Sequence, residues 1–155
     1  MISSDFPLFI YLFIEPFKNL LSARQVREFF QCGWPRELQA DETKNKIAAM
    51  RELYPIVIAA MLWGQQWGRW KLIFTCVNRS TVEGLCKGRS PFWGLMVLLR
   101  RLTWCALHSS FAFAAKLHVS HDCRSLLQVG VQQHLPSIDG LRKILCPTFQ
   151  QVILP

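Results

Sequence analysis

Residues 53–63, Leu-Tyr-Pro-Ile-Val-Ile-Ala-Ala-Met-Leu-Trp, and residues 71–77, Lys-Leu-Ile-Phe-Thr-Cys-Val, decide the fold that the sequence predicts. Apolar residues recur at helical spacing in the first stretch: Leu53, Ile56, Ala60 and Trp63. Gly64 ends this helix, and Pro55 is expected in its first turn, where the missing N–H costs nothing. The second stretch is a short apolar run between polar boundaries, which is typical of a buried strand.

The residues that follow continue this alternation. A brief helix capped by Ser80 is expected to run to Cys86, and a longer helix to open at Ser90 or Pro91. The apolar positions of the longer helix include Leu95, Leu98, Leu99, Leu102 and Ala106. Residues Phe111–Val119 form another candidate strand. The order helix, strand, helix, helix, strand predicts an α/β domain.

The flanking stretches have weaker patterns. Residues 1–17 fit a strand or an apolar helix, and residues 18–30 fit a helix. The polar residues 36–49 indicate a solvated connector, and the tail from Cys146 to Pro155 indicates an extended segment.

Composition and charge limit the class of protein. The chain has 155 residues, of which 51% are hydrophobic and only 18% charged, which argues for one folded domain and against disorder. Lys and Arg number 18 against 10 Asp and Glu, which gives a net charge of +8. Such a charge favours a polyanionic partner, either nucleic acid or an anionic membrane, although a basic surface can also bind nothing.

The cysteines and apolar runs indicate an intracellular protein, cytoplasmic or nuclear. None of the six cysteines forms a C-x-x-C pair, and most lie in apolar runs, as reduced and buried thiols do. The apolar stretch Phe6–Ile14 lacks the basic start of a signal peptide. No run reaches the roughly 18 to 20 uninterrupted apolar residues of a membrane span. The chain has six Trp and eleven Phe, which an incomplete core would leave exposed, so we expect the protein to self-associate.

Several stretches resemble the ribonuclease H region of DIRS-like retrotransposon polyproteins. They are Arg51–Gly64, Leu72–Asn78, Lys87–Ser90, Leu98–Ala106, Ala115–Val119 and Cys146–Pro155, in the order that the family has them. The resemblance implies an α/β fold with a mixed sheet flanked by helices, in which the N-terminal half is incomplete. In the family three antiparallel strands form that half, and residues 14–33 would have to supply most of it. The implied parts are a degenerate N-terminal part with the connector at 1–49, a best-preserved core at 50–119, and a degenerate C-terminal segment with the tail at 120–155.

The family hydrolyses the RNA strand of an RNA–DNA hybrid, with four carboxylates that hold two divalent cations, usually Mg²⁺. By resemblance, Glu52 matches the helix glutamate, and Val77 stands where the family has the aspartate at a strand end. Glu15 aligns loosely with the acid of the first strand, and Arg124 replaces the last aspartate, with Asp122 close by. The resemblance therefore implies a catalytically inactive domain without a metal or other cofactor. Taken alone, Glu52 can also be a solvated first-turn glutamate that favours the helix dipole.

Two further constellations have alternative interpretations. Trp63, Trp67 and Trp70 can stack on bases or pack in the core. The basic residues around them, which can contact phosphates through charge, are Arg69, Lys71, Arg79, Lys87, Arg89, Arg100 and Arg101. Potential zinc ligands lie at His118, His121, Asp122 and Cys123. Their spacing fits no standard finger, so we expect no zinc site.

Four functions are compatible with these observations. The first is an inactive ribonuclease H-like relic, and the second an inactive module with non-specific affinity for RNA–DNA hybrid or other nucleic acid. The third is a basic membrane-surface protein that uses residues Phe6–Ile14. The fourth is a working Mg²⁺-dependent nuclease with displaced acids, which would recruit Glu15, Asp122 and Asp139.

Overall fold

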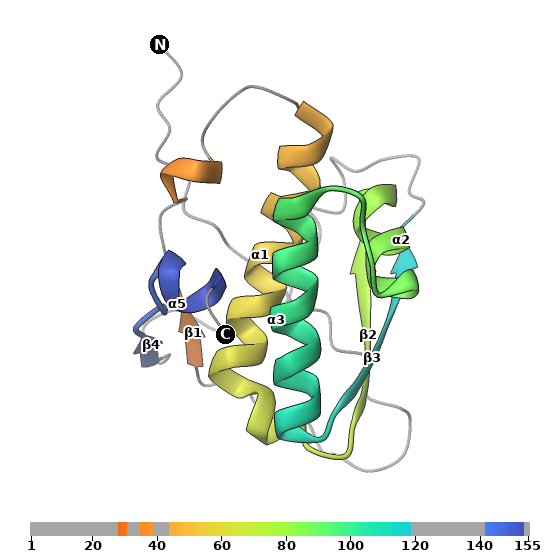
Figure 1. Cartoon of the computed structure of the whole chain (residues 1–155). Coiled ribbons are helices and arrows are strands. Elements are labelled where there is room, and N and C mark those ends of the chain that lie inside the picture. The colour runs from red at the N-terminus through yellow and green to blue at the C-terminus, as the bar shows by residue number, and fades with distance from the viewer. Residues whose placement is uncertain (1–27, 31–34, 39–43, 119–141, 154–155) are drawn as a thin grey trace, which may run out of the picture.

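Two pairs of parallel strands and the helices packed on them make up the part of the chain that the computed structural model describes, residues 28–30, 35–38, 44–118 and 142–153 (Figure 1). The strands are β1 (Glu28–Phe30), β2 (Lys71–Cys76), β3 (Ala112–Leu117) and β4 (Arg142–Ile144). The α-helices are α1 (Lys44–Trp63), α2 (Arg79–Lys87), α3 (Trp93–Ser109) and α5 (Phe149–Ile153), and short 3-10 turns lie at Arg36–Leu38 and Gly64–Trp67. The α/β class expected from the sequence is confirmed.

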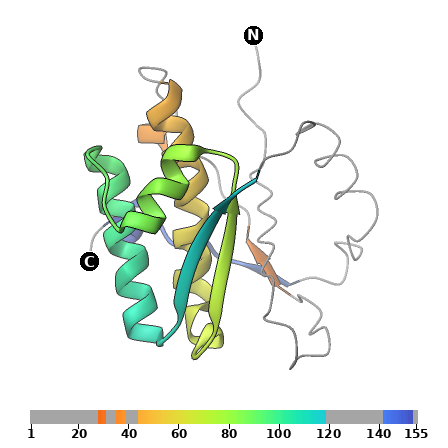
Figure 2. The ribbon, with the colours of Figure 1, turned by 90° about the vertical axis from the view of Figure 1, so that its right-hand side faces the viewer.

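Strands β2 and β3 form the larger pair, and α2 and α3 connect them. The strands run parallel in a register that pairs Lys71 with Ala112 and Cys76 with Leu117. Helices α1 and α3 lie side by side on one face of this pair (Figures 1 and 2). Parallel strands need such a crossover connection because a tight turn can only reverse the chain. The expected order helix, strand, helix, helix, strand is confirmed from α1 to β3.

The core lies between α1, α3 and the inner face of β2. Side chains along β2 alternate, and Leu72, Phe74 and Cys76 are buried. The largest fully buried aliphatic side chains of the two helices are Leu53, Val57, Ile58, Leu95, Leu98, Leu99 and Leu102. Since burial of one such side chain is worth about 1.5 to 3 kcal/mol, this layer supplies most of the stability.

Helix α1 begins earlier than the sequence predicts. It starts at Lys44, and a 3-10 turn covers Arg36–Leu38, so the expectation of a solvated connector over residues 36–49 is wrong for these two parts, while residues 39–43 lie outside the described ones. Leu38 is fully buried, and its carbonyl oxygen accepts a hydrogen bond of 2.8 Å from Nε of Arg51. The early start also places Pro55 inside the helix instead of in its first turn. Proline removes one helical hydrogen bond there, and burial of the residues on both sides compensates for this loss.

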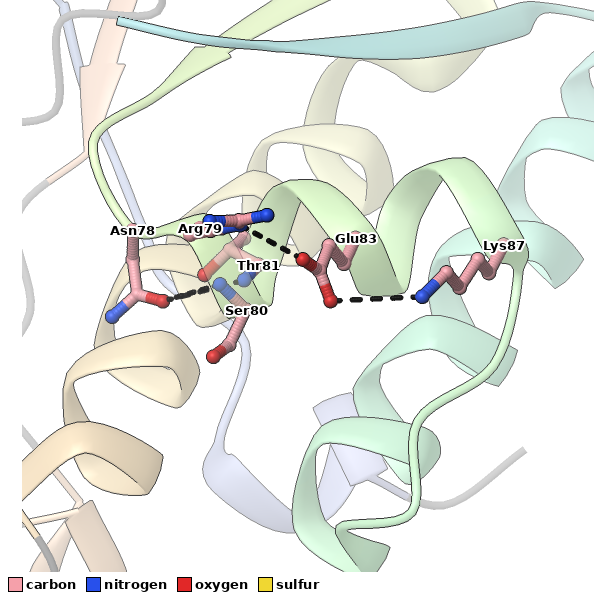
Figure 3. Close-up of polar contacts among 6 residues, drawn as sticks. All are labelled: Asn78, Arg79, Ser80, Thr81, Glu83 and Lys87. Atoms are coloured by element: carbon pink, nitrogen blue, oxygen red, sulfur yellow. Dashed lines mark hydrogen bonds and ion pairs between the residues drawn. The ribbon is translucent and has the colours of Figure 1, made fainter. Parts of the chain in front are cut away.

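The boundaries of α2 and α3 differ from the prediction by a few residues. Asn78, not Ser80, caps α2, because its Oδ1 accepts hydrogen bonds from the amides of Ser80 (2.9 Å) and Thr81 (3.4 Å) (Figure 3). Gly88 ends α2 in the left-handed conformation, with φ of 64°. Glycine adopts this conformation without steric cost. Ser90 Oγ accepts a hydrogen bond from the amide of Phe92, which precedes α3.

The chain tail is helical where an extended segment was expected. Helix α5 begins after Thr148, whose amide donates to Gln151 Oε1 (2.8 Å) while Thr148 Oγ1 accepts from the amide of Gln151 (3.4 Å). This reciprocal pair is a capping box, and the Thr-x-x-Gln pattern that encodes it is visible in the sequence. Val152, on the inner side of α5, is fully buried. The prediction of an extended tail is therefore wrong for Phe149–Ile153.

The smaller strand pair lies away from the larger one. Strand β1 runs parallel to β4, and Glu28 pairs with Arg142. The prediction of a helix that reaches Phe30 is therefore wrong for its last three residues. The family resemblance implies antiparallel strands over residues 14–33, but the pairing described at 28–30 is parallel. The rest of that stretch lies outside the described residues.

Among the described residues, one segment meets the criteria for a membrane span by length and composition. It covers Lys46–Trp67, which is most of α1 and the turn after it. More than half of its most apolar part is buried inside the protein. The central helix of a soluble domain meets the same criteria, so the expectation of no membrane span stays a prediction.

Candidate functional site

The carboxylate of Glu52 lies at the end of strand β2. Its Oε1 accepts a hydrogen bond of 2.6 Å from the amide of Val77, and its Oε2 accepts one of 3.1 Å from the amide of Asn78. Glu52 is in the interior of α1, so the interpretation as a solvated first-turn glutamate is wrong. The carboxylate instead binds two successive amides where the chain leaves the strand. Hydrogen bonds to an ionised acceptor are about twice as strong as neutral ones.

The same junction holds a second set of hydrogen bonds. Asn78 caps α2 through the amides of Ser80 and Thr81, as Figure 3 shows. Thr81 is fully buried, and its hydroxyl donates to the carbonyl oxygen of Ala49, 3.3 Å away. Helix α1 is thus tied twice to the connection between β2 and α2, once through Glu52 and once through Ala49. These hydrogen bonds hold α1 against the connection between β2 and α2.

The junction lacks a second carboxylate among the described residues. Val77, where the family has an aspartate, is 63% exposed and has no oxygen in its side chain. No group of three or more potential metal-binding side chains occurs in the described ranges, 28–30, 35–38, 44–118 and 142–153. Glu15, Asp122 and Asp139 lie outside these ranges. Glu52 is thus the one family-matching acid whose position the structure gives.

Glu83 is the acid nearest to Val77 and Asn78 along the chain, and it forms two ion pairs. Arg79 Nε is 3.0 Å from one of its oxygens and Lys87 Nζ is 3.6 Å from the other (Figure 3). The hydrogen bond from Arg79 and the charge of Lys87 lower the pKa of Glu83. These pairs run along the exposed side of α2, where an ion pair contributes little to stability.

Cys76 is a buried thiol beside the Glu52 carboxylate. Burial, together with the negative charge of Glu52, raises the pKa of Cys76 from 9.0 to about 12. Burial also raises the pKa of Cys105. A neutral thiol is a poor nucleophile, so Cys76 does not supply nucleophilic catalysis at neutral pH. Cys76, Cys86 and Cys105 are free thiols, as expected, but Cys86 is exposed.

The basic residues proposed from the sequence do not form one patch. Arg69 and Lys71 lie at the start of β2, whereas Arg79 and Lys87 lie beyond its other end, about 20 Å away for a six-residue strand. Arg79 and Lys87 also pair with Glu83. Arg89 is exposed. The remaining two, Arg100 and Arg101, are on α3.

The tryptophans at 63, 67 and 70 belong to the core. Trp67 is buried and packs edge-to-face on Phe111, with ring centroids 5.4 Å apart. Trp63 packs on Phe30 at 5.5 Å. Trp67 is therefore part of the core and is not available for base stacking, and Trp63 and Trp70 are partly buried and packed against that core, which supports the interpretation of the series as core packing. Among the described residues, the exposed tryptophans are Trp93 and Trp104, on α3, neither of which the sequence predicts as a site residue.

Two other features, His118 and a shallow hollow in the surface, are candidates for a site. His118 continues the β2–β3 ladder through its amide, which donates to the carbonyl oxygen of Cys76 at 2.8 Å. Its possible zinc partners, residues 121–123, lie outside the described residues. A shallow hollow of about 470 Å³ lies between α1, α3 and the tail, lined by Met61, Leu62, Arg101, Leu145, Cys146, Pro147 and Gln151. It is remote from Glu52.

Comparison of the chain with protein-family models, with curated proteins and with solved structures gives no match, so any assignment of function rests on the residues and their geometry.

Proposed function

We propose that this protein is a degenerate ribonuclease H-like domain of the DIRS-like retrotransposon type, catalytically inactive, with residual non-specific affinity for nucleic acid. The observation that carries the proposal is the contact between Glu52 and the end of β2. The resemblance assigns Glu52 and position 77 to one metal site, and the Glu52 carboxylate does lie 2.6 Å from the amide of Val77. The acid that would complete this part of the site is replaced by valine.

The loss of catalysis follows from ligand chemistry. Mg²⁺ needs near-octahedral oxygen coordination, and a two-metal mechanism needs several carboxylates to hold both ions. Glu52 belongs to no group of three or more potential metal ligands among the described residues, and both of its oxygens accept backbone hydrogen bonds. A cation would have to displace these hydrogen bonds and would gain a single protein ligand. The glutamate is therefore retained for structure.

The arrangement of elements supports the same proposal. From α1 to β3 the chain forms a helix with an acid in its interior, then a strand, two helices and a strand parallel to the first, which is compatible with the sheet flanked by helices that the resemblance implies. The two-helix crossover leaves the strand ends beside the N-terminus of α2. Ligands of α/β folds commonly bind at the carboxyl ends of parallel strands. Glu52 thus lies at the end of the strands where an α/β fold would bind a ligand.

Affinity for nucleic acid rests on charge. The protein has a net charge of +8, and Arg69, Lys71 and Arg89 are exposed on its surface. Such a domain would act inside the cell, in the cytoplasm or nucleus, where nucleic acid is available. Exposed apolar side chains such as Leu107 (75%) and Leu145 (91%) support the further expectation that the protein self-associates.

The first prediction concerns hydrolysis. The purified protein should not cleave a labelled RNA–DNA hybrid with Mg²⁺ or Mn²⁺, since the metal ligands are missing. The Val77→Asp variant should remain inactive, because one restored acid beside Glu52 still leaves the site without its other ligands. Gel analysis of the labelled RNA strand measures this. Metal-dependent cleavage by the wild type that Glu52→Ala abolishes would contradict the proposal and favour a working nuclease with displaced acids.

The second prediction concerns binding. Affinity for a hybrid or a single strand should depend little on base sequence and should fall steeply as salt rises, because each phosphate contact releases a counterion. Fluorescence polarisation at several salt concentrations gives the slope of log K against log salt. A slope near zero, or a strong preference for one sequence, would show that the interaction is not electrostatic in origin.

A further inference from the structure

The outer side of α3 has exposed aromatic residues, whereas its inner side packs in the core. Helix α3 is the outermost helix, in front of α1 in Figure 1 and at the left-hand side of Figure 2. Its inner residues, which are buried, are Leu95, Leu98, Leu99, Leu102, Cys105 and Ala106. On the opposite side Trp93 is 69% exposed and Trp104 is 56% exposed. A tryptophan side chain that stays in water forgoes a large gain from burial, so two on one helix need an explanation.

The two rings lie on one face and at a fixed separation. Trp93 and Trp104 are eleven residues apart, close to three turns of 3.6 residues, so their side chains project in nearly the same direction. The rise between them is about 16 Å at 1.5 Å per residue. Arg100 lies on the same face, with its guanidinium 5.5 Å from the centre of the Trp93 ring. The Trp104 ring stacks on His108, with centroids 5.9 Å apart and planes 17° apart.

The charge on this face is of one sign. Helix α3 contains no Asp or Glu in its 17 residues. At its N-terminal end, Lys46 Nζ lies 5.3 Å from the centre of the Phe92 ring. The Phe92 and Trp93 rings are thus each accompanied by a cationic side chain. A positively charged surface with aromatic rings between its charges is complementary to single-stranded nucleic acid, whose phosphates are anionic and whose bases stack.

We propose that single-stranded nucleic acid binds along the outer face of α3, with bases stacked on Trp93 and Trp104 and phosphates beside Arg100. The proposal rests on the proposed function and gives its non-specific affinity a location. The separation of about 16 Å matches roughly five nucleotides at the 3.4 Å spacing of a stacked strand. Stacking is indifferent to base identity, because every base has a π-face, so the absence of sequence preference follows.

Other occupants fit this face less well. A second copy of the chain would bring Arg100 against a surface that has no acid to receive it. A membrane surface would require a continuous apolar face, but Arg100 lies between Trp93 and Trp104, and of the leucines of α3 only Leu107 is exposed. The acid-free, aromatic and basic character favours a flexible polyanion over both.

The test uses the full chain and labelled single strands of dT and of U, about 15 nucleotides long, a length within the range that such binding surfaces cover. The double variant Trp93→Ala/Trp104→Ala should bind about tenfold or more weakly, with an unchanged salt slope, since only stacking is lost. Trp93→Phe/Trp104→Phe should retain most of the affinity. Arg100→Gln should reduce the salt slope by about one counterion. Leu145→Ala, at an apolar side chain that is 91% exposed, is the matched control and should bind as the wild type does.

Each outcome decides the proposal. Circular dichroism melts check that the variants fold, as the exposure of both tryptophans predicts. Unchanged binding by Trp93→Ala/Trp104→Ala would overturn the α3 site and leave the proposed function intact. No binding by the wild type would overturn both. Binding to phosphatidylserine vesicles without binding to either oligonucleotide, or dimerisation that the double variant abolishes while oligonucleotide affinity is unchanged, would assign the face to a different occupant and overturn the proposal.

Discussion

Replacing Phe74 with alanine is expected to lower the free energy of unfolding by about 3 to 5 kcal/mol, because the ring fills the centre of the core. Phe74 is 2% exposed in the middle of β2, and its ring packs against that of Phe113, with centroids 6.1 Å apart. Truncation removes the transfer free energy of the ring and leaves a cavity that neighbouring residues fill incompletely. Urea denaturation followed by circular dichroism measures the change.

Val77→Ala is the matched control for this variant. Val77 follows β2 directly but is 63% exposed, so its truncation should change stability by less than about 0.5 kcal/mol. If Phe74→Ala proved as mild as Val77→Ala, the inner face of β2 would not be the core in solution. The statement that α1 and α3 pack on β2 would then be wrong.

The variant Glu52→Ala should lower the free energy of unfolding by about 1 to 3 kcal/mol, because it leaves two amides without their charged acceptor. The cost stays within this range because Glu52 is only half-buried and water can reach part of the junction. Glu52→Gln should lose less, since its carbonyl oxygen can still accept one hydrogen bond. Denaturation curves at pH 7 compare both variants with the wild type.

Glu83→Ala is the control for the glutamate variants. Glu83 sits on the solvent side of α2, and its ion pairs with Arg79 and Lys87 are exposed. Its removal should therefore have a far smaller effect than Glu52→Ala. Equal effects of the two substitutions would mean that the carboxylate of Glu52 does not hold the junction between β2 and α2.

The central part of the fold was predictable because its elements have one clearly buried face. The apolar spacing from Leu53 onward gave α1, and the apolar run at 71–77 gave β2. Helix boundaries were less predictable, since they depend on caps. Neither the cap at Asn78 nor the capping box at Thr148–Gln151 follows from apolar spacing. The pairing of Glu28 with Arg142 joins residues far apart in the chain, and local periodicity carries no information about such a contact.

The candidate site was predictable only in part. Periodicity alone does not bring Glu52 to Val77, and the family resemblance supplied that pairing. Apolar spacing does not indicate that Trp93 and Trp104 are exposed, because α3 is apolar on both sides, with leucines on one and these two tryptophans on the other. When both faces are hydrophobic, the sequence cannot indicate which of them packs against the core. Only the placement of α3 against α1 decides it.

The central claim is that the Glu52 carboxylate is a structural acceptor for backbone amides and not a ligand for a divalent cation. Titration of the isotope-labelled protein with Mn²⁺, followed by nuclear magnetic resonance, tests this most directly, because a bound paramagnetic ion broadens the signals of nearby amides. We expect the amide signals of Val77 and Asn78 to broaden no more than those of other exposed residues. In Glu52→Ala the same amides should exchange with solvent faster than in the wild type. Selective broadening of the Val77 and Asn78 signals by Mn²⁺ that disappears in Glu52→Gln would place a cation on the carboxylate and contradict the account.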